Sequence, residues 1–214
     1  MKKHIKSYID TEMKRYFEGR DLVKSKRDEW KDFQRKSEDL FSEYVSAVQD
    51  NGYKHWLYMD STKENKLSDF DHKYITLFFG LDSTGLYKLD NEDRPKIDHQ
   101  GGCALHISQL VTGDVSVLFY PFQSDLYKAN EDSLLYGIYS SPNRVSQQKL
   151  DFFVKLLFSY ARGTSYGRNI DVLDRLRIRW MKIRHWRYGR GKSGLIKSLL
   201  DAALQLAGLV KPTS

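Results

Sequence analysis

Apolar residues recur every three or four positions through the first fifty residues, which predicts a long amphipathic helix over residues 3–50. We expect an interruption at Gly19 and an end at Asn51-Gly52, because glycine adopts the left-handed conformation that caps helices. The apolar face either packs on the protein's own domain or pairs with a second chain as a short coiled coil. It comprises Ile5, Tyr8, Ile9, Met13, Tyr16 and Phe17, followed by Trp30, Phe33, Leu40, Tyr44 and Ala47.

Residues 53–140 change character and contain short runs of aromatic and β-branched residues separated by turn-forming stretches. No helical crossover separates the runs, so they predict an antiparallel sheet of about four to six strands. In the clearest hairpin, formed by residues 103–110 and 115–122, Cys103, Leu105 and Ile107 should face the core. Residues 90–98, which precede this hairpin, should form a polar loop. The runs are residues 54–59, 72–80, 103–110, 115–122 and 134–139.

The helical pattern returns near Ser146, and it predicts a helix over residues 146–162 that Gly163 ends. A basic aromatic helix, a glycine-rich joint at Gly189, Gly191 and Gly194, and an apolar helix over residues 195–210 should follow. The sequence therefore predicts an α+β fold with three parts. These are a helical arm (residues 1–50), a core of antiparallel sheet and one helix (53–163), and C-terminal helices packed on that core (168–214).

Charge is distributed unevenly along the chain, which carries 35 lysine and arginine residues against 28 aspartate and glutamate residues. The tract from Arg175 to Lys192 (RLRIRWMKIRHWRYGRGK) contains eight of the cations and no acidic residue. The rest of the chain is nearly neutral without it. A local block of positive charge can dock on an acidic partner.

Placed on a helix, five apolar residues of this region fall within one arc of about 100°, bordered by cations on both sides, while Ile178 and Met181 interrupt the polar face behind it. The arc consists of Val172, Leu173, Leu176, Trp180 and Ile183. Under a nucleic-acid hypothesis, the arc packs on the sheet and the cations face phosphates, while aromatic rings stack on unpaired bases. The candidate binding residues are Arg175, Arg177, Arg179, Trp180, Lys182, Arg184, Trp186, Arg187, Tyr188, Arg190 and Lys192.

Two other hypotheses fit the same tract. In the first, the arc enters the boundary of an anionic bilayer, the cations snorkel, and the tryptophans sit among the headgroups. In the second, the cations solvate a core helix or contact a protein partner. Largely sequence-independent nucleic-acid binding is the leading expectation, with peripheral membrane association as the alternative. A protein partner or a second copy of the chain could also bind the N-terminal helix.

No catalytic, cofactor or metal signature stands out, and we expect a binding or adaptor protein rather than an enzyme. The residues from Gly189 to Ser193 lack the first glycine of a phosphate-binding loop. A hydrolase or nuclease using Asp69, Asp71 and His72 with Mg²⁺ is the remaining enzymatic alternative. A single cysteine, no signal-peptide pattern and no long apolar run predict a cytoplasmic protein. Under the lipid hypothesis, it would associate with the inner face of the membrane.

Overall fold

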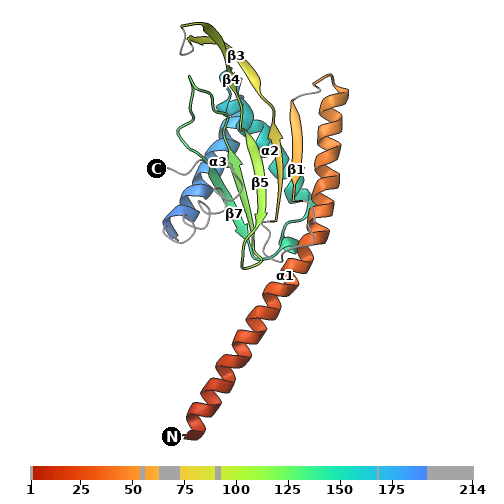
Figure 1. Cartoon of the computed structure of the whole chain (residues 1–214), viewed down its shortest axis with the longest axis vertical. Helices are drawn as coiled ribbons and strands as arrows, with labels where there is room; N and C mark the ends of the chain where they lie inside the picture. The colour runs from red at the N-terminus through yellow and green to blue at the C-terminus, as the bar shows by residue number, and fades with distance from the viewer. Residues whose placement is uncertain (1, 54–55, 63–72, 90–92, 168, 192–214) are drawn as a thin grey trace.

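The computed structural model of the chain describes residues 2–53, 56–62, 73–89, 93–167 and 169–191 (Figure 1). A long helix, α1 (Lys2–Asp50), precedes a sheet, and two helices, α2 (Gln147–Thr164) and α3 (Val172–Gly191), follow it. The short helical turn η1 (Pro142–Arg144) leads into α2. The expected α+β fold with an antiparallel sheet is confirmed.

The main sheet has five strands in the order β1-β2-β5-β6-β7, and every neighbouring pair is antiparallel. A two-stranded ribbon, β3 and β4, is inserted between β2 and β5. The strands are β1 (Leu57–Ser61), β2 (Tyr74–Phe79), β3 (Asp82–Leu89), β4 (Pro95–Gln100), β5 (Ala104–Gln109), β6 (Val115–Tyr120) and β7 (Leu134–Tyr139).

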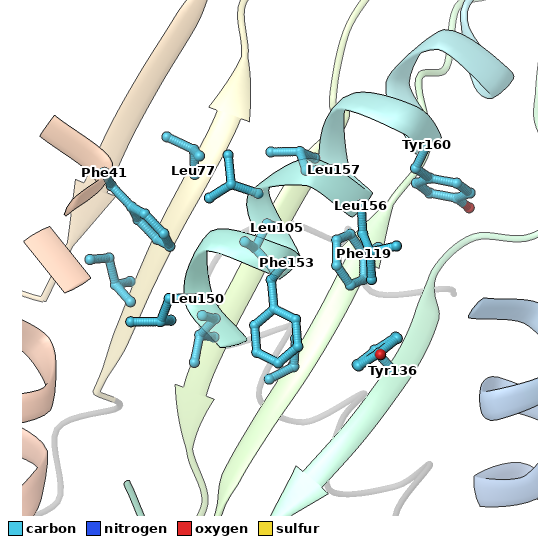
Figure 2. Packing of buried hydrophobic residues seen from close by; sticks show 14 of the residues in the cluster. Phe41, Leu77, Leu105, Phe119, Tyr136, Leu150, Phe153, Leu156, Leu157 and Tyr160 are labelled. Carbon is cyan, nitrogen blue, oxygen red and sulfur yellow. The ribbon is translucent and has the colours of Figure 1, made fainter. Parts of the chain in front are cut away.

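The core lies between one face of this sheet and α2, with the C-terminal half of α1 closing one side (Figure 2). Cys103, Leu105 and Ile107 belong to this core, as their alternation predicted. Ser146 caps α2, since its hydroxyl accepts a hydrogen bond from the Lys149 backbone N–H. The apolar face of α2 packs against the sheet. Burial in this core raises the pKa of the Cys103 thiol well above its usual range.

Three sequence predictions about glycines and loops are wrong. Helix α1 passes through Gly19 without interruption, because a glycine costs an exposed helix only about 1 kcal/mol and its neighbours are good helix formers. Helix α2 ends at Thr164, one residue after the predicted stop at Gly163, whereas α3 continues through the predicted joint at Gly189 to Gly191. Residues 90–98 are not simply a loop, since β4 begins at Pro95. By contrast, Gly52 has a φ of 90° just after α1, as the expected capping requires.

Helix α1 consists of two unlike halves. Its C-terminal half packs on the sheet through buried Trp30, Phe33 and Phe41. Contact with the body begins at Val23, whose backbone carbonyl lies beside Gly113 in the turn between β5 and β6. In the same turn, the ammonium group of Lys26 pairs with Asp114 at 2.7 Å. The residues before Val23 form an arm that extends away from the sheet (Figure 1).

Candidate functional site: the outward face of helix α3

The N-terminus of α3 is fixed by two aspartates with different roles. The carboxylate of Asp171 accepts a hydrogen bond of 2.6 Å from the backbone N–H of Asp174, which caps the helix. The buried carboxylate of Asp174 accepts two hydrogen bonds from the Arg162 guanidinium on α2, at 2.6 and 2.7 Å. This bidentate pair lowers the pKa of Asp174 and ties the first turn of α3 to α2.

The middle of α3 packs against edge strand β7 with polar residues. Arg184 donates from Nε to the backbone carbonyl of Tyr136 at 2.9 Å, and its guanidinium carbon lies 4.4 Å from the centre of the Tyr136 ring. His185 accepts a hydrogen bond of 3.0 Å from the Leu135 N–H through Nδ1. These contacts satisfy backbone groups that an edge strand would otherwise expose.

The side of α3 opposite these contacts is apolar and exposed. Its stripe comprises Val172, Leu173, Leu176, Trp180 and Ile183, whose exposed fractions range from 41% to 71%. The expectation that this arc packs on the sheet is therefore wrong. The inward positions belong instead to Asp174, Ile178, Met181 and His185, because the polar members of that set find partners on α2 and β7.

Only some of the predicted cations share the outward face with the apolar stripe. Arg175, Arg179 and Arg187 are exposed there, and Trp186 lies beside them with 54% of its surface exposed. Lys182 is also exposed but forms an ion pair with Glu131. The outward face of α3 therefore presents aliphatic, indole and guanidinium groups side by side.

The other candidate residues are placed differently. Arg177 donates to the Ser159 hydroxyl at 3.1 Å, and Arg184 faces Tyr136, so neither guanidinium points outward with the stripe. Tyr188 is half-buried near Gly137. Arg190 lies in the last turn of α3, but its side chain falls outside the described residues, as does Lys192.

Among the described residues, histidine, cysteine and carboxylate side chains are not grouped into a metal site. Cys103 and His106 lie on opposite faces of the sheet, and the His99 ring contacts the Ile97 carbonyl at 3.1 Å. Asp69 and Asp71 lie outside the described residues, as does the neighbouring histidine. Within the described ranges, no group of three or more His, Cys, Asp or Glu side chains is placed to hold a metal ion.

The residues that orient α3 were not predicted from the sequence. Arg162, Glu131 and His185 were given no role, although they contact α3 or belong to its inward face. One signal was present: Ile178 and Met181 interrupt the polar side of the helix, and Met181 is fully buried. Apolar residues on an otherwise polar face marked the side that packs inward.

Comparison with protein-family models, curated proteins and solved structures finds no match to this chain. In the part of the chain that the structure describes, no helix is both long and apolar enough to cross a membrane.

Proposed function

We propose that this is a binding protein that attaches to an anionic phospholipid surface through the outward face of α3. The observation that carries the proposal is the exposed stripe around Leu176, Trp180 and Ile183, with Arg179 on its flank. Helices that lie in a membrane interface combine these properties: an apolar strip, flanking cations and tryptophan. Figure 1 places α3 at the flank of the molecule beyond β7, the opposite edge of the sheet from α1.

Aliphatic side chains favour lipid over nucleic acid on this face. Leu173, Leu176 and Ile183 gain little from a phosphate backbone, whereas each would leave water on entering the acyl boundary. The guanidinium groups of Arg175 and Arg179 would remain at headgroup level, where each contributes about 1 kcal/mol through anionic lipid. Apolar burial and charge would therefore act together.

Nucleic acid is a second candidate ligand, and the two exposed tryptophans favour it. Trp180 and Trp186 lie on the same face as Arg179 and Arg187. Indole rings stack on unpaired bases with about 1–3 kcal/mol per base, and arginines bind phosphates. Such binding would use the cations and the rings but not the aliphatic residues, which separates the two ligands experimentally.

Vesicle flotation tests the proposal directly. The protein should float with phosphatidylcholine vesicles that contain phosphatidylserine and should not float with phosphatidylcholine alone. The double substitution Leu176→Ser and Ile183→Ser should abolish flotation while retaining affinity for single-stranded oligonucleotides at low salt. Retention of vesicle binding in this variant contradicts the lipid proposal.

A second pair of variants isolates the contribution of charge. Replacing Arg175, Arg179 and Arg187 by glutamine should lower the binding constant for anionic vesicles at least tenfold. The matched control replaces three exposed cations of α1, which are Lys14, Arg20 and Arg35. It removes the same net charge and should bind as the unmodified protein does. Equal losses of vesicle binding in both variants would mean that the total charge of the protein drives binding and that the position of the cations on α3 does not matter.

A further inference from the structure

The N-terminal arm of α1, residues 4–22, carries an apolar stripe that the described body of the protein does not cover. Its exposed fractions range from 42% to 67%, although the side chains are large. The stripe consists of Ile5, Tyr8, Ile9, Met13, Tyr16 and Phe17. An isolated helix of this length is marginal in water, so a partner on this stripe would stabilise the arm considerably.

The stripe continues the buried face of the same helix. Ile9, Tyr16, Val23 and buried Trp30 each lie seven residues apart, so the exposed stripe runs into the buried set that begins at Trp30. This is the heptad spacing by which one helix packs against another. The body occupies this face from Lys26 onward, while the arm offers the same face to something else.

The charge of the arm identifies the kind of partner. Residues 4–22 contain four basic and four acidic residues, so the arm is neutral, unlike α3. Some of these charges already pair along the helix, as Arg15 does with Glu12 at 2.9 Å. A neutral arm does not select an anionic ligand or a strongly charged protein, whereas it matches a second copy of itself.

We propose that two copies of this chain dimerise by antiparallel pairing of their α1 arms. In a parallel pair in register, the two α1 helices would continue to face each other beyond the arms. From Lys26 onward that face is already occupied by each chain's own body, so the two bodies would collide. Antiparallel pairing places the bodies at opposite ends of an overlap roughly 28 Å long. It also brings the aliphatic half of each arm, with Ile5 and Ile9, onto the aromatic half of the other, with Tyr16 and Phe17.

Sedimentation of the full chain tests the dimer. The particle should have twice the 25.1 kDa mass of the chain at micromolar concentration. The substitutions Ile9→Asp and Tyr16→Asp should raise the dissociation constant roughly a hundredfold, because each buries an unpaired carboxylate. Ser7→Asp places the same group on the opposite side of the arm and should leave the dimer intact. The near-ultraviolet signal of buried Trp30 reports that each variant is folded.

Cysteine crosslinking tests the orientation. The native Cys103 is buried, so a thiol introduced on the exposed arm would react in preference to it. A mixture of Ile9→Cys and Phe17→Cys proteins, whose positions lie opposite each other in this overlap, should form the mixed disulfide under mild oxidation, and neither protein alone should crosslink efficiently. Efficient crosslinking of Ile9→Cys with itself overturns the antiparallel arrangement. A monomeric unmodified chain, or a dimer unaffected by the aspartate pair, overturns the proposal as a whole.

Discussion

Asp174 of α3 is held by Arg162 of α2 through two parallel hydrogen bonds of 2.6 and 2.7 Å. The Asp174 side chain is only 2% exposed, whereas that of Arg162 is 44% exposed. A buried carboxylate with a charged, bidentate partner tolerates few other orientations of its helix. This contact helps to turn the polar side of α3 inward and the apolar stripe outward.

The Asp174→Asn substitution should destabilise the protein by about 1–3 kcal/mol, because a neutral amide cannot accept both hydrogen bonds from Arg162. Urea unfolding, followed by circular dichroism, measures this change. Asp32→Asn is a suitable control, since Asp32 forms an exposed pair with Arg35 and should contribute less than 1 kcal/mol. Equal effects of the two substitutions would contradict the role given to Asp174.

Gly163 lies where α2 and α3 approach each other closely. A β-carbon at this position would lie 2.3 Å from Cδ1 of Ile178, so one of the two side chains must move. The Gly163→Ala substitution should therefore cost about 1–2 kcal/mol despite the better helix propensity of alanine. Adding Ile178→Val removes the offending methyl group and should recover part of the loss in thermal unfolding. Additive losses in the double variant would show that the two sites are independent.

His185 should make the protein less stable as the pH falls. Burial lowers the pKa of His185 below its ordinary value of 6.5, and the carboxylate of Glu131, which pairs with Lys182, opposes this shift. The unfolded chain then takes up the proton at a higher pH than the folded one. The contribution of His185 to the free energy of unfolding is fully present above pH 6.5 and is lost as the pH falls from there through the lowered pKa of the folded state. Protonation of Nδ1 would also remove the acceptor for the Leu135 N–H.

The His185→Gln substitution checks this pH dependence, since glutamine retains an acceptor for the Leu135 N–H but does not titrate. Urea midpoints measured about one pH unit above and below 6.5 should differ less in the variant than in the unmodified protein. His99→Gln, at an exposed position, is the matched control. An unchanged difference in His185→Gln would contradict this assignment.

The parts of the fold that follow from the sequence are those in which one face is apolar and the other polar. The long helix, the hairpin of β5 and β6, and the face of α2 were predicted for this reason. The β3–β4 ribbon has no buried apolar face, because Tyr87 and Leu89 are both exposed and the first four residues of β3, from Asp82 to Gly85, carry no large apolar side chain. Its apolar pattern is therefore too short to identify a strand.

The orientation of α3 could not be predicted, because it depends on partners distant in sequence. Arg184 contacts Tyr136, 48 positions earlier, and His185 contacts Leu135, 50 positions earlier. Before those contacts are known, charged residues are expected outside and apolar residues inside, whereas α3 turns Asp174, Arg184 and His185 toward the body and exposes its apolar stripe. Of the candidate binding residues, Arg177 and Arg184 therefore lie on the side of α3 that faces the body, whereas Arg175, Arg179 and Arg187 lie on the outward side.

The fluorescence of Trp180 tests most directly whether the outward face of α3 enters a lipid surface. In a variant with Trp56 and Trp186 replaced by phenylalanine, the remaining tryptophans are exposed Trp180 and buried Trp30. Phosphatidylserine-containing vesicles should shift the emission to shorter wavelength, and bromine atoms on the acyl chains should quench it. If such vesicles leave the emission spectrum unchanged while single-stranded oligonucleotides quench the emission of Trp180, membrane attachment through α3 is contradicted.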